Sequence, residues 1–112
     1  RVIDRSLPNA PRFFVGYGKG KPFVSDEVLE NYREYVILHE LIEFEVFKGL
    51  EDQCLSALKE ELLMLPHEIK KDYIRFRTFS FRELVNYLEE RFPGSKPVIE
   101  SRKSLVYLES LV

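Results

Sequence analysis

The order of apolar and polar positions predicts a short hairpin followed by a series of amphipathic helices. Two short apolar runs, 12–15 and 22–24, flank the glycine-rich segment 16–21, which is typical of a β-hairpin. From residue 26 onward, apolar positions recur at helical spacing. We therefore expect an α+β fold that is mostly helical, with one short N-terminal β-hairpin and about five helices. The first two expected helices cover 26–48 and 53–65. A third begins at residue 66, a fourth follows residue 80, and the last covers 98–112.

Several residues have the side chains that mark helix ends. Ser25 is suited to begin the first helix and Gly49 to end it, while Asp52 is suited to cap the second. Ser80 and Glu83 match a capping box, in which each side chain accepts a hydrogen bond from an exposed amide. This motif predicts that a new helix begins at Ser80. The segment 74–79 also fits a strand, although its spacing favours a helix.

Length and composition are those of one globular domain. The 112 residues are 45% apolar and 32% charged, so a single domain over 1–112 has enough apolar surface for a core, with an irregular lead-in over 1–12. The net charge of −2 argues against nucleic-acid binding by the whole surface, since such domains are usually basic. No apolar run reaches the length of a membrane span.

Two further features bear on the setting of the chain. A single cysteine, Cys54, forms no internal disulfide, which indicates a reducing compartment and a cytoplasmic location. The sequence begins with Arg1 rather than Met. We therefore expect the chain to be part of a larger protein or assembly, whose other parts are unknown.

Two ionisable residues of the first predicted helix fall on its apolar side. His39 and Glu43 are four residues apart, so they share one face of a helix. Tyr32, Val36 and Val46 are predicted to lie on the same buried side. A carboxylate is costly to bury unless it is paired or binds a cation. This pattern indicates either a metal site or a core histidine that is hydrogen-bonded to Glu43.

The segment His39-Glu40-Leu41-Ile42-Glu43 resembles the His-Glu-x-x-His helix of the zincin metallopeptidases. The resemblance covers five residues, and Glu43 stands where the family has its second histidine. It implies that His39 and Glu43 are zinc ligands and that Glu40 is the general base for zinc-bound water. The implied function is a zincin-like metal-binding domain, either a metal-dependent hydrolase or an inactive relative.

A third ligand is needed, and the next predicted helix offers candidates. On a helical wheel Cys54 and Glu61 fall on the same side as the apolar positions, whereas Glu60 points away. Either Cys54 or Glu61 is therefore the third ligand. Cys54 with His39 as a thiol–base pair is another interpretation, although a lone cysteine on an apolar face is more often inert.

The C-terminal segment 80–112 reads as helix, turn and helix, and it resembles the core of helix-turn-helix DNA-binding proteins. The resemblance implies that Lys96, Arg102 and Lys103 contact nucleic acid. Glutamates on the same helices oppose this interpretation, and two simply packed amphipathic helices explain the pattern as well. A nucleic-acid-binding regulatory module and a protein-interaction domain of a larger protein are the alternatives to a metal site.

Overall fold

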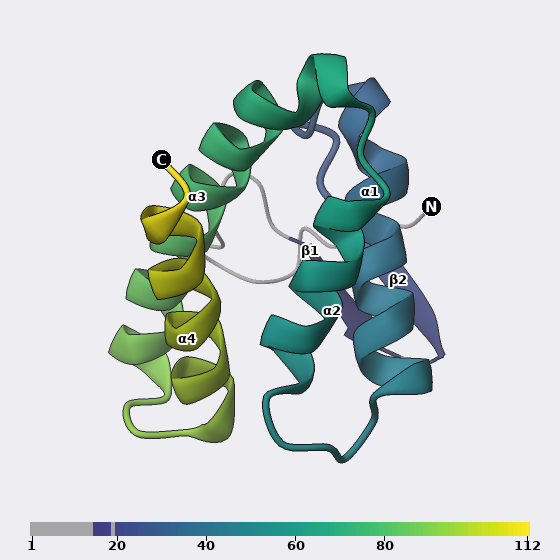
Figure 1. Cartoon of the computed structure of the whole chain (residues 1–112). Coiled ribbons are helices and arrows are strands. Elements are labelled where there is room, and N and C mark those ends of the chain that lie inside the picture. The colour runs from purple at the N-terminus through teal and green to yellow at the C-terminus, as the bar shows by residue number, and fades with distance from the viewer. Residues whose placement is uncertain (1–14, 19) are drawn as a thin grey trace.

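The computed structural model describes residues 15–18 and 20–112. These residues form one two-stranded sheet, one π-helical segment and four α-helices (Figure 1). In chain order the elements are β1 (Val15–Gly18), β2 (Lys21–Val24), α1 (Glu30–Leu41), η1 (Ile42–Val46), α2 (Gln53–Leu63), α3 (His67–Arg91) and α4 (Lys96–Ser110). The expected lead-in 1–12 and the first residues of the expected hairpin lie outside the described residues.

The predicted hairpin is confirmed over the part that is described. β1 and β2 are antiparallel, with Val15 opposite Val24 and Gly18 opposite Lys21. The hairpin packs on η1 through Tyr17, whose ring stacks on Phe44 at 5.3 Å between centroids. The hydroxyl of Tyr17 also donates a hydrogen bond to Glu45 at 2.6 Å. These contacts fix the sheet beside the segment that carries Glu43.

The first helix is shorter than predicted and changes its winding near the end. Ser25 accepts a hydrogen bond from the amide of Glu27, but this closes only a turn, and α1 begins at Glu30. After Leu41 the chain widens into the π-helix η1, where the amide of Phe47 donates to the carbonyl of Ile42, five residues earlier, at 2.8 Å. The prediction of one α-helix over 26–48 was therefore wrong at both ends. Single π turns of this kind are frequent at functional sites.

The predicted helix start at Ser80 is also wrong, because α3 runs without interruption from His67 to Arg91. Ser80 is buried, and its hydroxyl donates to the carbonyl of Arg77 within the same helix at 3.2 Å. The buried stripe of α3 continues through Ser80, so packing on both sides favours one long helix. For this reason there are four α-helices among the described residues instead of about five. The alternative strand over 74–79 is excluded, since the segment lies inside α3.

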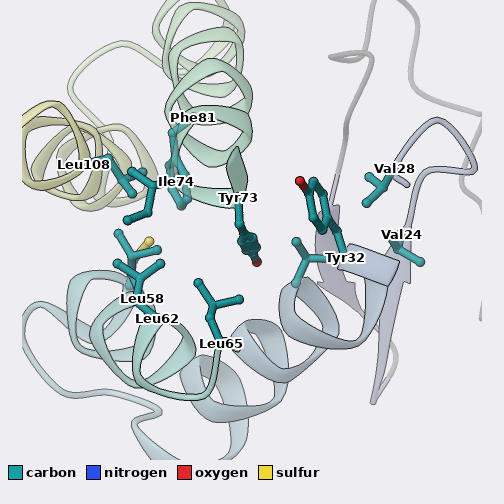
Figure 2. Close-up of a cluster of buried hydrophobic side chains, with 12 residues drawn as sticks. Val24, Val28, Tyr32, Leu58, Leu62, Leu65, Tyr73, Ile74, Phe81 and Leu108 are labelled. Atoms are coloured by element: carbon teal, nitrogen blue, oxygen red, sulfur yellow. The ribbon is translucent and has the colours of Figure 1, made fainter. Parts of the chain in front are cut away.

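The helices form two antiparallel pairs, α1 with α2 and α3 with α4, which meet around a common core (Figure 1). Tyr73 of α3 is fully buried near the centre of this core, and its ring makes an edge contact with the ring of Tyr32 of α1. Leu58 of α2 and Leu108 of α4 are equally buried on the other side (Figure 2). Among the described residues, no helix combines the length and the apolar character that crossing a bilayer requires.

Candidate metal centre

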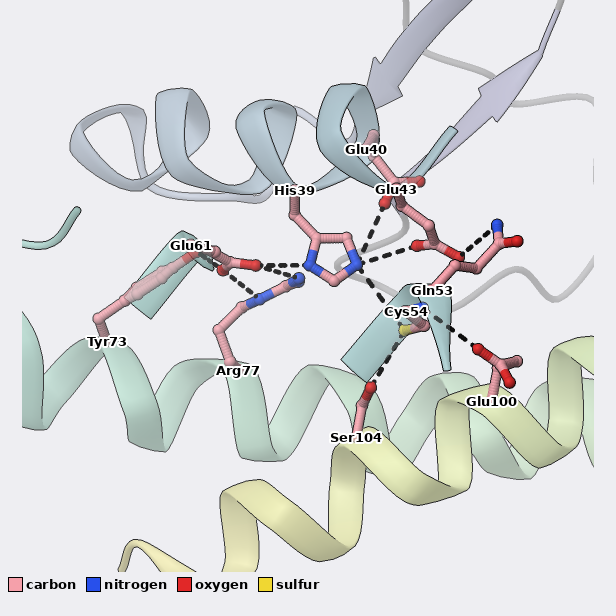
Figure 3. A network of polar contacts seen from close by, with 10 residues as sticks. All are labelled: His39, Glu40, Glu43, Gln53, Cys54, Glu61, Tyr73, Arg77, Glu100 and Ser104. Atoms are coloured by element: carbon pink, nitrogen blue, oxygen red, sulfur yellow. Dashed lines mark hydrogen bonds and ion pairs between the residues drawn. The ribbon is translucent and has the colours of Figure 1, made fainter. Parts of the chain in front are cut away.

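His39, in the last turn of α1, is the centre of a buried polar cluster (Figure 3). Its side chain is buried, and its two ring nitrogens face different partners. Nδ1 lies 2.7 Å from Glu61 Oε1, while Nε2 lies 3.0 Å from Glu43 Oε1. Nε2 is also 3.7 Å from Cys54 Sγ and 3.7 Å from Glu40 Oε2. The prediction that His39 and Glu43 turn inward is confirmed.

Glu61 is fully buried and held from three sides. Besides His39, it is paired with Arg77, whose Nε lies 2.9 Å from Oε2, and it accepts a hydrogen bond from the hydroxyl of Tyr73. Burial alone would raise the pKa of Glu61, but Arg77 and His39 lower it below the usual value. Glu61 is therefore a charged partner that fixes the ring of His39, an arrangement common for metal-binding histidines. Glu60, as predicted, is exposed.

Cys54 lies on the opposite side of the imidazole, in the first turn of α2. Its sulfur accepts a hydrogen bond from the hydroxyl of Ser104 at 3.1 Å, and its backbone amide donates to Glu100 Oε1 at 3.2 Å. Both partners come from α4. Glu100 thus satisfies an amide at the start of α2 that Asp52 leaves open, because Asp52 has a left-handed backbone and makes no capping hydrogen bond.

The three atoms that face one another fit the ligand set of a transition metal. One ligand atom each from His39, Glu43 and Cys54 lies within 4.8 Å of the other two. Tetrahedral zinc holds nitrogen and sulfur ligands about 3.6 Å apart and nitrogen and oxygen ligands about 3.3 Å apart. The corresponding distances here are 3.7 Å and 3.0 Å. Of the two predicted third ligands, Cys54 shares the Nε2 side with Glu43, whereas Glu61 faces Nδ1.

Negative charge is in excess around His39. Glu40, Glu43, Glu61 and Glu100 are all buried, and among the buried residues that the structure describes only Arg77 and His39 oppose them. Burial lowers the pKa of His39, but contacts with Cys54, Glu43 and Glu61 outweigh it and raise the pKa well above the usual value. Burial also raises the pKa of the Cys54 thiol. Without a metal, the cluster retains protons that a bound cation would displace.

Glu40 is the clearest case, because burial, opposed by the charge of His39, raises its pKa from 4.5 to about 7. Between these values the unfolded chain releases the proton and the folded chain keeps it, so stability falls as the pH rises. Glu40→Gln removes this dependence. The metal-free variant is expected to gain about 3 kcal/mol relative to the parent between pH 4 and pH 8, measured by urea denaturation. Glu60→Gln is the matched exposed control, and equal pH profiles for all three proteins would contradict this prediction.

A cavity of about 570 Å³ opens beside the cluster. The ligand candidates and Glu40 form part of its wall, and the rest comes from the hairpin, η1, α3 and the start of α4. Its apolar wall includes Phe23, Phe44, Phe81, Leu84, Leu88 and Pro97. A catalytic zinc centre has three protein ligands and an open position, and this cavity gives the open position room.

The residues predicted to bind nucleic acid lie on α4, and each has a partner within the chain. Arg102 pairs with Glu89, and the ammonium group of Lys103 lies 2.5 Å from Asp52 Oδ1. The ammonium group of Lys96 donates to Gln53 at 3.4 Å. Lys96 therefore borders the His39 cluster through Gln53, whereas Arg102 and Lys103 pair with Glu89 and Asp52. Nucleic-acid binding stays a prediction from the sequence.

Five residues of the cluster were not identified from the sequence, namely Gln53, Tyr73, Arg77, Glu100 and Ser104. Gln53 donates to Glu43 Oε2 at 3.4 Å, which helps to orient this carboxylate. A weak signal exists for Glu100 and Ser104, since their four-residue spacing places both on one face of α4. Nothing in the sequence indicates that this face meets Cys54.

Comparison with known proteins does not assign the chain to a family. No protein-family model, curated protein or solved structure matches the sequence. The zincin and helix-turn-helix resemblances therefore stay predictions, and the function has to be inferred from the residues of this chain.

Proposed function

We propose that this chain is a zinc-binding domain of zincin-like chemistry, with a centre organised for metal-assisted hydrolysis. His39, Glu43 and Cys54 are the ligands. Glu40 is the general base, because its carboxylate lies 3.7 Å from His39 Nε2, on the side of the imidazole that faces Glu43 and Cys54. Zinc, when bound, supplies a Lewis acid and an activated water at neutral pH.

The observation that carries this proposal is the convergence of three ligand atoms inside an acidic interior. Each ligand side chain belongs to a residue that is less than one-tenth exposed. Their atoms lie within 4.8 Å of one another, beside further buried carboxylates. Among the described residues, the buried carboxylates outnumber the buried cations His39 and Arg77. A divalent cation bound between the three ligand atoms would supply the missing positive charge.

The ligand types favour zinc among the common divalent ions. Thiolate and imidazole ligands select zinc and other transition metals, whereas magnesium and calcium prefer oxygen ligands alone.

The residues that contact the ligands have supporting roles, which follow from their contacts. Glu61 fixes the ring of His39 through Nδ1, Ser104 supports the sulfur of Cys54, and Gln53 holds the second oxygen of Glu43. Such supporting contacts typically change metal affinity by about 10- to 100-fold.

A cysteine nucleophile is the competing use of the same residues, since Cys54, His39 and Glu61 follow the order of nucleophile, base and orienting acid. The contacts favour the metal. Glu43 is closer to Nε2 than the sulfur is, at 3.0 Å against 3.7 Å. Burial also raises the pKa of the Cys54 thiol, which disfavours the reactive thiolate unless a cation is present.

Cobalt titration of the metal-free protein tests the proposal. We expect one Co²⁺ per chain, with a thiolate-to-cobalt charge-transfer band that Cys54→Ser abolishes. His39→Ala is expected to weaken binding at least ~100-fold, because it removes the ligand common to all the contacts. His67→Ala, on the exposed start of α3, is the matched control and should bind as the parent does.

Two results would overturn the metal site. One is the absence of stoichiometric binding. The other is binding that His39→Ala and Cys54→Ser leave unchanged. Alkylation of the metal-free protein by iodoacetamide separates the competing use. A nucleophilic cysteine should react faster than a free thiol at neutral pH, whereas a metal ligand whose thiol pKa is raised by burial should react more slowly.

A further inference from the structure

The cavity beside His39 has an apolar wall that the metal site does not need. Phe23 of the hairpin, Phe44 of η1 and Leu88 of α3 contribute to this wall, and all three are only partly buried. They come from three different elements, so the wall is built by the tertiary fold. Its volume of about 570 Å³ lies within the range of small-molecule sites.

The polar end of the cavity is acidic. Glu40, Glu43 and Glu100 border it, together with the candidate ligands His39 and Cys54. Arg77 also lies there, but its guanidinium group is paired with Glu61. The remaining lysine or arginine of the described wall is Lys96, at the start of α4, and its ammonium group is hydrogen-bonded to Gln53. An anionic ligand would therefore meet repulsion that these cations do not offset.

From this division we infer that the cavity binds the apolar portion of a small, uncharged substrate, whose reacting carbonyl group lies at the His39 end. This inference rests on the proposed function, and it adds the substrate class. An extended chain of methylene groups along Phe23, Phe44 and Leu88 would leave water on binding. Each buried methylene strengthens binding roughly three- to fourfold. A long acyl compound is thus preferred over a short one, and a neutral compound over a carboxylate.

Alkyl hydroxamates provide the probe, because they ligate zinc or cobalt directly and can be varied in chain length. Octanohydroxamate is expected to bind the cobalt-loaded protein at least ~100-fold more tightly than acetohydroxamate. Octanamide and octanoate, which share the chain but differ in charge, test the preference for a neutral ligand. Octanoate should displace octanohydroxamate at least ~10-fold less effectively than octanamide does. The dissociation constants can be read from changes in the cobalt absorption.

Substitutions in the wall locate the effect. Leu88→Gln should reduce the chain-length preference at least ~10-fold while acetohydroxamate binding stays within about twofold. Leu88→Phe, which keeps the wall apolar, should also weaken the octanoyl compound by filling the space. Leu63→Gln is the matched control, since Leu63 is 74% exposed on α2.

The outcomes separate this inference from the proposed function. Stoichiometric cobalt and acetohydroxamate binding without any chain-length preference would overturn the cavity assignment and leave the metal site standing. If no metal binds, the proposed function and the inference about its substrate both fail. The metal-free protein is then titrated with an uncharged naphthalene ketone dye. Saturable binding that Leu88→Gln weakens would show an apolar site without a metal, and the absence of binding would exclude that site as well.

Discussion

Saturating zinc is expected to raise the melting temperature of the metal-free protein by about 15 °C. A ligand that binds only the folded state at roughly 1,000 times its dissociation constant adds ~4 kcal/mol of stability. For a domain of this size each kcal/mol corresponds to about 4 °C. The physical source is the excess of buried carboxylates around His39, whose mutual repulsion the cation removes. Differential scanning fluorimetry with and without zinc measures the shift.

Two comparisons make the zinc result specific. Glu43→Gln keeps the size of the side chain but removes a charged ligand, so most of the shift should be lost while the metal-free variant folds normally. Magnesium should produce almost no shift, because it prefers oxygen ligands. A shift of the same size in His39→Ala would show that zinc binds elsewhere, and no shift in the parent protein would contradict a metal centre.

Arg77→Met is expected to reduce the free energy of unfolding by about 3–5 kcal/mol, because it removes the guanidinium group that is paired with the buried, charged Glu61. Arg77 is 3% exposed, and Glu61 is fully buried. Domains of this kind have a total stability of only about 5–15 kcal/mol, so the variant loses a large part of it. Urea denaturation near neutral pH measures the loss. The double variant Arg77→Met/Glu61→Gln also removes the carboxylate charge of Glu61. It should recover at least half of the lost stability.

The neighbouring surface offers a control for this prediction. Arg75 is exposed on the same helix and lies 3.9 Å from Asp72. An exposed pair of this type contributes about 0–1 kcal/mol, so Arg75→Met should change the stability little. Equal effects of the two arginine substitutions would show that burial of the Glu61 pair has no special energetic role.

The parts of the fold that follow from short-range pattern were predictable. The two apolar runs around the glycine-rich segment predicted the hairpin, and helical spacing predicted that His39 and Glu43 turn inward. The same spacing separated buried Glu61 from exposed Glu60. Each of these features depends on residues within one or two turns of each other, where sequence periodicity is directly informative.

The parts that depend on distant packing were not predictable. Ser80 has the local sequence of a helix start, yet it lies in the interior of α3. The buried residues of α3 continue before and after Ser80, so core packing favours one uninterrupted helix. Glu100 and Ser104 contact Cys54 across 46 and 50 residues of sequence. No spacing rule links residues so far apart, so the choice between Cys54 and Glu61 as third ligand needed three-dimensional information.

The widened turn η1 has a consequence for how this sequence can vary in length. A π turn holds one residue more than an α turn, so deleting a single residue from Ile42–Val46 would return the segment to ordinary winding. The extra residue is absorbed by the wider turn, so the positions after such a deletion would keep nearly the same direction about the helix axis. A one-residue deletion in the α-helical part of α1 would instead rotate every following position by about 100°. A deletion within Ile42–Val46 that spares Glu43 is therefore expected to disturb the path to Cys54 less than a deletion within Glu30–Leu41.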